Sequence, residues 1–469
     1  MQCNVSCSGG GTTSISGIVM DPAGTDPLYN VIAYVPSTAL GTLPSGVLTG
    51  ADKCSCSALL QGNPIVYAST DTSGKFTISN APVGADITLV VQVGKWRKQV
   101  KVTTTACAAT DAGTISLPKN GTEGDIPDIA VSTGAADSLE CLMRRVGLDA
   151  SEYVPGWTQP GHVHIFNGGK EESNPMTGAP SSAASLWDST DDLMKNDIVL
   201  LSCEGQEPAA AIPQNLEDYL NAGGRAFASH FHYAWFSGTL EGAGGAGYAA
   251  PADWGTNLAQ WTGGGGGGGG QAAVGGEIVT TLTGGGSFPK GLALQTWLGN
   301  VGALGGSVAA TELPVVAPRY NASVTTQKPS QSWIQLDPTT DPTGILAPTL
   351  YFSFDTPVGA AASPDGGPPQ YCGRAVFSGL HVGGASYDGV NCSSGTGKGG
   401  IGGGGGAGGG EGCNAGHVAA APPPTGCDTS HPLSPQEKAL EFMLFDLSAC
   451  VIPENIPPES DAGSVYIPK

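Results

Sequence analysis

The chain of 469 residues is acidic, since 40 Asp and Glu side chains against 19 Lys and Arg side chains give a formal net charge of −21. Nucleic acids and anionic lipids bind through Lys and Arg, so this balance disfavours both as partners. No stretch of about 18 apolar residues is present, and we expect no transmembrane helix. The length is sufficient for two or three domains with hydrophobic cores.

Twelve cysteines, most of them in loop-like sequence, indicate disulfide bonds and an oxidising compartment. We expect an extracellular, periplasmic or outer-surface protein. No signal peptide is visible, and we interpret the sequence as a mature form. The spacing does not fix the pairing. One candidate bond is Cys3–Cys7, and another would restrain the glycine-rich segment between Cys392 and Cys413, with Cys427 just beyond it.

Residues 13–118 alternate between apolar and polar side chains with a period of two, which is typical of β-strands. About seven strands are predicted, at residues 14–20, 31–35, 66–69, 75–78, 87–93, 99–103 and 114–117. This number predicts an antiparallel β-sandwich of the immunoglobulin-like kind. Residues 1–12 form a tail before the sandwich, and the polar residues 119–127 form a linker after it.

The turns of this segment carry a family resemblance. Its motifs read Gly17-x-Val19-x-Asp21-x-x-Gly24, Pro27-Leu28-x-Asn30-Val31, Thr70-Asp71-x-x-Gly74-x-Phe76-x-Ile78 and Ala81-Pro82-x-Gly84. Over almost its whole length the segment resembles the carboxypeptidase regulatory-like (transthyretin-like) domain. The resemblance implies an accessory sandwich without catalysis, attached to a secreted enzyme or a surface protein.

One basic and aromatic spot stands out in this half of the chain. Trp96 is surrounded by Lys95, Arg97 and Lys98. We interpret this spot as an exposed hairpin whose long side chains lie along the surface, rather than as a ligand contact.

From residue 128 on, short apolar strands alternate with amphipathic helices, a pattern that predicts a parallel sheet covered by helices. Strands are predicted at residues 129–132, 162–166, 198–201, 225–229 and 372–382, and helices at 138–145, 183–195 and 215–221. Asp137 or Ser138 is the expected cap of the first helix, and Ser434 with Glu437 forms a capping box at the start of the last one. We predict an α/β flavodoxin-like domain of three layers over residues 128–450.

Long segments interrupt this domain. The insertion at residues 237–370 contains a run of eight glycines, and further strands are expected in it at residues 277–282, 332–336 and 349–354. A second glycine-rich loop spans residues 395–412, and residues 451–469 form a C-terminal tail. Tracts of this composition favour surface loops over core.

The order of these elements resembles class I glutamine amidotransferase-like proteins, and in particular their trehalose-utilisation-like branch, over residues 125–236 and 372–450. That family's nucleophilic cysteine follows the strand at 225–229, where this chain has His230. Its histidine matches His381, its glutamate is replaced by Gly383, and its oxyanion loop corresponds to the segment around Cys203. The resemblance implies a pocket without the glutamine-hydrolysing triad. The whole chain resembles a group of secreted bacterial proteins of unknown function.

Polar side chains follow three of the predicted strands. Cys203 and Glu204 follow the strand at 198–201, His230 and His232 follow the strand at 225–229, and His381 ends the last strand. The carboxyl ends of parallel strands meet at one edge of a sheet, so we expect these side chains to lie close together. His162 or His164 is a further candidate for the same edge.

This cluster suits a metal. On an extended segment His230 and His232 share one face, as two metal ligands or an acid–base pair require. His381 is then a third ligand and Glu204 a fourth, a set that suits a divalent metal such as zinc. The alternative is structural, with histidines that are hydrogen-bonded beneath a long loop.

Cys203 has a catalytic interpretation as well. It is a candidate nucleophile with His381 or His230 as its base, which makes Cys203, Glu204, His230 and His381 the candidate catalytic residues. The alternative is a disulfide-bonded cysteine or a small buried side chain.

Two functions therefore remain open. One is a secreted or cell-surface, non-catalytic binding or structural protein with a degenerate amidotransferase-like pocket and a cell-surface or polysaccharide partner. The other is a hydrolase or metal-dependent enzyme that uses His230, His232, His381 and Glu204.

Overall fold

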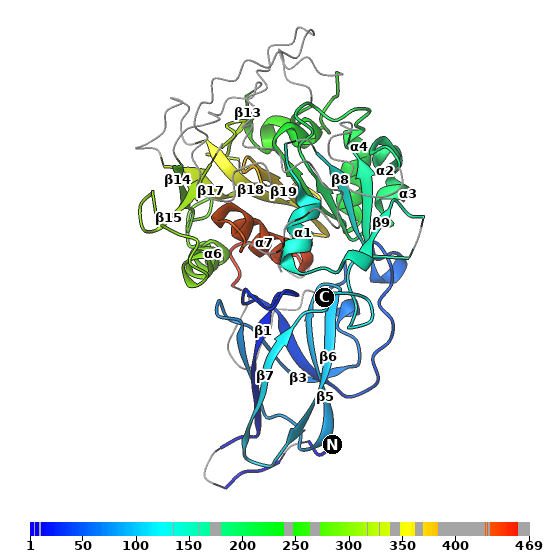
Figure 1. The fold of residues 1–469 in the computed structure, drawn as a ribbon, viewed down its shortest axis with the longest axis vertical. Coiled ribbons are helices and arrows are strands. Elements are labelled where there is room, and N and C mark those ends of the chain that lie inside the picture. The colour runs from blue at the N-terminus through cyan, green and yellow to red at the C-terminus, as the bar shows by residue number, and fades with distance from the viewer. Residues whose placement is uncertain are drawn as a thin grey trace.

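The computed structural model describes the chain except for residues 4, 9–10, 135, 159, 169–179, 239–246, 263–272, 317, 328, 338–347, 362–368, 383–426, 428, 430–431 and 458–469. It has several β-sheets with many strands and few helices, and is a β-rich multidomain protein (Figure 1). The glycine run and the second glycine-rich loop, with Cys392 and Cys413, lie outside the described residues.

The N-terminal strands form two sheets, seen below the large sheet in Figure 1. All seven predicted strands are present. One sheet has the order β4-β1-β7 and the other the order β3-β2-β5-β6. Their bounds are β1 (Ser14–Met20), β2 (Ile32–Pro36), β3 (Pro64–Ser69), β4 (Lys75–Ser79), β5 (Gly84–Val93), β6 (Trp96–Thr104) and β7 (Ala109–Ser116).

The pairing departs from the expected antiparallel sandwich in one place, because β1 runs parallel to β7. The chain crosses from one sheet to the other between β6 and β7. No hairpin therefore dictates the direction of β7, which is free to lie alongside β1 in either sense.

A ten-stranded sheet dominates the remainder, in the order β15-β14-β17-β18-β19-β12-β11-β8-β10-β9. The six strands from β19 to β9 run parallel to one another. Parallel sheets are buried on both faces, and β8, β11 and β19 are buried at every position. The bounds are β8 (Ile129–Thr133), β9 (Tyr153–Pro155), β10 (Val163–Asn167), β11 (Ile198–Leu201), β12 (Arg225–Ser229) and β19 (Gly373–Ser378).

The insertion extends this sheet. Beyond β19 four strands pair antiparallel: β18 (Thr349–Thr356), β17 (Ser330–Leu336), β14 (Val274–Ile278) and β15 (Glu312–Val315). A small separate sheet pairs β13 (Gln260–Trp261) with β16 (Ala322–Ser323). The sequence indicated three of these strands but not that they join the parallel core.

Helices cover both faces of the sheet. Ile198 and Leu200 of β11 share a core with α1 (Leu139–Val146), α6 (Pro289–Asn300) and α7 (Pro435–Ser448), and this core continues into the sandwich. Val199 and Leu201 instead face α2 (Ala184–Trp187), α3 (Thr190–Leu193), α4 (Pro213–Ala222) and α5 (Ala234–Ser237). Successive side chains of one strand thus contribute to two cores, one on each face of the sheet. Short 3₁₀ turns complete the chain: η1 (Gly50–Asp52), η2 (Ser57–Leu59), η3 (Ala150–Glu152), η5 (His230–Tyr233) and η6 (Gly255–Asn257).

The sequence signals for the starts of helices are confirmed in part. The capping box at the start of α7 is formed, with Ser434 accepting from the Glu437 backbone N–H. The helix expected at 183–195 is divided into α2 and α3, because Ser189 caps a new helix by accepting from the Asp192 N–H. The Asp137–Ser138 cap is not formed, since Ser138 precedes α1 without a side-chain hydrogen bond.

Trp96, Lys95 and Arg97 are buried, which corrects the interpretation of the basic and aromatic spot as an exposed hairpin. The ring of Trp96 lies 5.7 Å, between centroids, from that of Phe445 on α7. Lys95 pairs with Asp197 at 2.5 Å, just before β11. These residues hold the sandwich against the large sheet. Their side chains serve a buried contact between the two parts and do not face solvent.

Four disulfide bonds are present among the described residues. The expected Cys3–Cys7 bond is wrong, since Cys7 pairs with Cys107 and Cys3 is an exposed thiol. Cys427 pairs with Cys141 of α1. Two more bonds, Cys54–Cys372 and Cys56–Cys450, join the loop between β2 and β3 to the large sheet and to the end of α7.

Disulfides persist in oxidising compartments, so the four bonds are compatible with an extracellular protein. In the part of the chain that the structure describes, no helix is both long and apolar enough to cross a membrane.

Candidate functional site

Three of the sequence-predicted residues meet at the carboxyl edge of the parallel strands. Cys203 follows β11, His230 follows β12 directly, and His381 lies just beyond β19. All three are buried, and one ligand atom of each lies within 4.8 Å of the others. Cys203 Sγ is 3.3 Å from His230 Nδ1, and the two imidazole centroids are 4.9 Å apart. The edge therefore holds a compact thiol–imidazole–imidazole cluster.

His230 has a strained backbone, with φ at 38° in the left-handed region. For a residue other than glycine this conformation costs on the order of 1–3 kcal/mol. It arises where the chain turns abruptly from β12 into η5. Such a turn directs the first side chain after the strand toward the edge of the sheet, and strained residues of this kind gather at functional sites.

His232 does not join the cluster. Residues 230–233 form the 3₁₀ turn η5 instead of an extended strand, so His230 and His232 do not share a face. The His232 Nδ1 accepts from the Trp235 Nε1–H at 2.9 Å, and its Nε2–H donates to the Ser202 carbonyl at 2.9 Å. Burial lowers the pKa of His232 to about 4. Both ring nitrogens are used, and the residue is structural.

Glu204 lies beside His232 and outside the cluster. Its Oε1 is 3.6 Å from His232 Nε2 and accepts from the Ser132 hydroxyl at 3.4 Å. Burial raises the pKa of Glu204 to about 9, so the carboxyl is protonated at neutral pH. The expected metal set of His230, His232, His381 and Glu204 is therefore not assembled.

The Cys203 thiol and His230 form a neutral pair. Burial raises the pKa of the thiol, and burial also lowers the pKa of His230 well below its usual range. The thiol therefore keeps its proton, and one hydrogen bond joins Sγ and His230 Nδ1. The Gly205 N–H donates to Sγ at 3.4 Å. Cys203 has no disulfide partner among the described residues.

Asp137 and Ser229 are functional candidates that the sequence reasoning missed. The Asp137 carboxylate accepts from the Val382 N–H at 2.7 Å and from the Ser229 hydroxyl at 2.5 Å. The Ser229 oxygen in turn accepts from the Cys203 N–H at 2.8 Å. These hydrogen bonds connect the end of β12 to the segments that follow β8, β11 and β19. An aspartate between a strand and a helix is a signal for a functional site. In this sequence, however, Asp137 was explained as a helix cap.

His162 and His164 lie at the opposite edge, because they stand at the start of β10 and not at its end. His164 Nδ1 is 2.9 Å from the Gly156 carbonyl, and His162 Nδ1 is 2.5 Å from Glu152 Oε2. Neither residue reaches the cluster.

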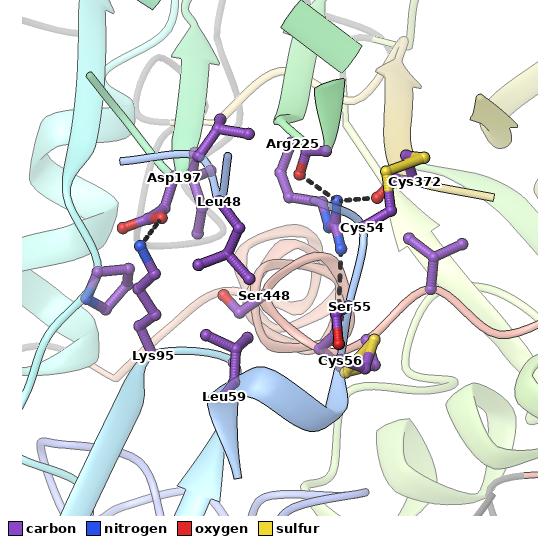
Figure 2. A pocket seen from close by; sticks show the side chains of 18 of the residues that line it. Leu48, Cys54, Ser55, Cys56, Leu59, Lys95, Asp197, Arg225, Cys372 and Ser448 are labelled. Carbon is purple, nitrogen blue, oxygen red and sulfur yellow. Dashed lines mark hydrogen bonds and ion pairs between the residues drawn. A yellow bond between two sulfur atoms is a disulfide. The ribbon is translucent and has the colours of Figure 1, made fainter. Parts of the chain in front are cut away.

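A cavity of about 80 Å³ also lies at this opposite edge, between the sandwich and the sheet (Figure 2). Lys95 and Asp197 pair in its wall. The Arg225 guanidinium donates to the Gly223 and Cys372 carbonyls at 2.6 and 2.8 Å. The charged groups of the cavity thus connect parts of the protein to one another, and the two disulfides at Cys54 and Cys56 border it.

Next to this cavity Arg374, at the start of β19, is fully buried among acids. Its guanidinium lies 2.7 Å from Asp355, 2.8 Å from Asp446 and 2.8 Å from Glu454. Lys290 contacts Asp446 at 2.9 Å. These carboxylates hold the pKa of Arg374 above its usual range despite burial, so the guanidinium keeps its charge.

Comparisons with known proteins assign no family. No family model matches the chain, and no curated protein matches it. Solved structures with local similarity include a type II cohesin–X-dockerin complex of Acetivibrio cellulolyticus, at 16% identity over 27% of this chain and 78% of that chain with a TM-score of 0.15. A 9R-lipoxygenase of Cyanothece PCC8801 matches at 16% over 25% and 18%, with a TM-score of 0.14. The Bacillus cereus pilin subunit BcpA matches at 15% over 23% and 30%, with a TM-score of 0.15. At such TM-scores none of them bears on the fold or the function of this chain.

Proposed function

We propose that the protein is an extracellular, non-catalytic binding protein. In this proposal its C-terminal part is a flavodoxin-like domain of the amidotransferase type with a degenerate pocket, and its N-terminal part is a carboxypeptidase regulatory-like accessory sandwich. The parallel strand order β10-β8-β11-β12-β19 supports the first assignment. When the three-residue edge strand β9 is left out, the order along the chain is 2-1-3-4-5, the order of flavodoxin-like sheets.

The turn after β12 is the observation that carries the proposal. In class I amidotransferases the nucleophilic cysteine occupies this turn. Here the abrupt turn is kept, with φ at 38°, and an imidazole stands in it. The thiol that is present, Cys203, comes from the neighbouring strand and is fully buried.

The state of that thiol argues against nucleophilic catalysis. A thiolate is the attacking species, and reactive cysteines are partly exposed in electropositive surroundings. Burial and the nearby Asp137 raise the pKa of Cys203 instead. For the binding partner we propose a cell-surface component such as a polysaccharide, because a net charge of −21 disfavours polyanions.

The first test combines glutamine hydrolysis with thiol labelling. We expect no ammonia from glutamine, and labelling of the native protein at Cys3 but not at Cys203, located by peptide mass spectrometry. Cys3→Ser is the matched control, because it removes the exposed thiol and leaves the buried one. Ammonia release that Cys203→Ser abolishes would overturn the proposal. The binding role is tested by sedimentation with insoluble polysaccharides, where absence of co-sedimentation with all of them would count against that partner.

A further inference from the structure

We propose that Cys203, His230 and His381 form a binding site for a thiophilic transition-metal ion, Zn²⁺ or Cu⁺. One thiolate and two imidazoles are the ligands. The inference goes beyond the binding role proposed above and does not depend on it, since a metal held here is compatible with a protein that catalyses nothing.

The spacing of the ligand atoms is close to that of a metal site. Zinc lies about 2.3 Å from sulfur and about 2.0–2.1 Å from nitrogen, so ligand atoms of a tetrahedral site are about 3.5 Å apart. Cys203 Sγ and His230 Nδ1 are 3.3 Å apart, and all three groups offer an atom within 4.8 Å of the others. To close the set, atoms up to 4.8 Å apart have to approach to about 3.5 Å. The ligand type favours zinc or copper over magnesium or calcium, which prefer oxygen.

An unpaired nitrogen points to a missing ligand. His381 is 6% exposed, and its Nε2 has no hydrogen-bond partner in the described part of the chain. A buried polar atom without a partner costs about 1–3 kcal/mol, so natural structures rarely leave one without a reason. His232 provides the contrast, because it is equally buried and uses both of its nitrogens.

Asp137 is placed near the position of the outer contact that metal-binding imidazoles usually have. Its Oδ1 lies 4.0 Å from His381 Nδ1, beyond hydrogen-bond distance, and has to approach the ring to complete the carboxylate–histidine–metal arrangement. The same carboxylate holds Ser229, which accepts from the Cys203 backbone. The ligands are thus fixed by strand ends and hydrogen bonds, as a preformed site requires.

The local charge also favours a cation. The Asp137 carboxylate lies beside the cluster. Metal binding itself drives release of the Cys203 proton, so an ion bound here faces a thiolate and a carboxylate.

The experiment uses the full chain, stripped with a chelator and kept with its disulfides intact. It is titrated with Co²⁺ as a spectroscopic probe of the zinc arm, and with Cu⁺ against a competing chelator in the copper arm. We expect one equivalent of Co²⁺ with a thiolate-to-cobalt charge-transfer band in the near ultraviolet, displaced by Zn²⁺. The preferred ion is the one that outcompetes the other.

The variants decide which residues bind. Cys203→Ser is expected to abolish the charge-transfer band, and His381→Ala to weaken binding at least about tenfold. Asp137→Asn is expected to weaken it about tenfold, in the range of outer contacts. Cys3→Ser and His162→Ala are the controls and are expected to bind as the unaltered chain does.

A band that survives Cys203→Ser, or the absence of stoichiometric binding in both arms, would overturn the site. Should Cys203→Ser not fold, X-ray absorption of the zinc-loaded, unaltered chain decides instead. It is expected to show one sulfur at about 2.3 Å with nitrogen at about 2.0–2.1 Å. A first shell of oxygen and nitrogen without sulfur would contradict the proposal.

Discussion

Polar side chains at the two ends of the parallel strands differ in their charge and in their contacts. At the amino ends Lys95, Arg225 and Arg374 are ionised or hydrogen-bonded to neighbouring carboxylates and carbonyls. At the carboxyl ends Cys203 and His230 are neutral, and nitrogen atoms of His230 and His381 have no partner among the described residues. Both sets are buried, so burial alone does not distinguish them.

The difference separates stability from function. A buried charge is tolerated only when partners compensate it. The amino edge meets this condition with ion pairs, and the disulfides there attach the sandwich to the sheet. Single side-chain atoms without a hydrogen bond occur at both edges, among them Arg225 Nε and Glu454 Oε2 at the amino edge. The carboxyl edge differs in that its unpaired atoms are imidazole nitrogens and that His230 has a strained backbone. Groups kept in that condition by a folded protein are typical of sites that bind something. Three variants, one of them a double substitution, test this comparison, and a fourth tests a buried acid on α7.

The largest loss is expected from Arg374→Met. It leaves the carboxylates of Asp355, Asp446 and Glu454 buried around an apolar side chain, with Lys290 as the cation beside Asp446. Breaking a buried ion cluster by removing one partner costs about 3–5 kcal/mol. Urea unfolding followed by circular dichroism measures it.

Lys98→Ala is the control for this variant, because Lys98 pairs with Glu123 at 3.0 Å on the surface. Exposed pairs contribute at most about 1 kcal/mol. If the two variants unfold at the same urea concentration, the amino-edge cluster does not stabilise the fold.

The next loss is expected from Cys54→Ser combined with Cys372→Ser. This bond spans 318 residues and joins the loop between β2 and β3 to the large sheet. Its removal is expected to cost about 2–4 kcal/mol, chiefly because the unfolded chain regains freedom. The unfolding midpoint without reductant measures the loss. Removing Cys7–Cys107, which lies in the N-terminal part alone, is the comparison. An unchanged midpoint for the first pair would mean that non-covalent contacts suffice to hold the interface.

Glu441→Gln is expected to stabilise the protein at high pH. Burial, with Asp21 and Asp26 nearby, raises the pKa of Glu441 well above its usual value. The folded state therefore binds this proton more tightly than the unfolded chain, and stability falls as pH rises above the unfolded pKa of about 4.5. The variant removes that loss, so its melting temperature is expected to exceed that of the unaltered chain at pH 8.

Below pH 4 the same variant is expected to match the unaltered chain, because the carboxyl is then protonated in both states. Glu277→Gln on β14 is the matched change at an exposed position. A gain that is equal at pH 4 and pH 8 would show that the charge of Glu441 is not its cause.

The smallest effect on stability is expected from His230→Asn. Asparagine tolerates the left-handed backbone better than histidine, so relief of strain offsets the lost ring contacts. We expect a change within about 1 kcal/mol, with loss of cobalt binding. His232→Asn is the matched variant, since it removes two hydrogen bonds and is expected to cost about 1–3 kcal/mol. Equal losses would erase the distinction between the two histidines.

Sequence patterns predicted the elements well where the signal is local. The seven strands of the N-terminal part, the strands β8, β10, β11, β12 and β19, and the cap of α7 follow from side-chain periodicity and from a motif only four residues long. The meeting of Cys203, His230 and His381 was also predictable, because parallel strands bring their carboxyl ends to one edge.

Other residues of the site were not predictable, for identifiable reasons. His232 was expected beside His230 because an extended backbone was assumed, and the φ of 38° at His230 rotates the following residues away. Asp137 was expected to cap a helix next to it, whereas its partners are Ser229 and Val382, which are distant in sequence.

By itself, the sequence determined the succession of strands and helices and which reactive side chains stand at strand ends, because these depend on a few neighbouring residues. Only the tertiary structure decided which of those side chains meet, how the cysteines pair and which face of the sandwich is covered. Trp96 and Lys95 illustrate the last point, since nothing near them in the chain announces Phe445 or Asp197. Contacts between residues hundreds of positions apart depend on the packing of whole elements, and that packing is where this protein's candidate site is made.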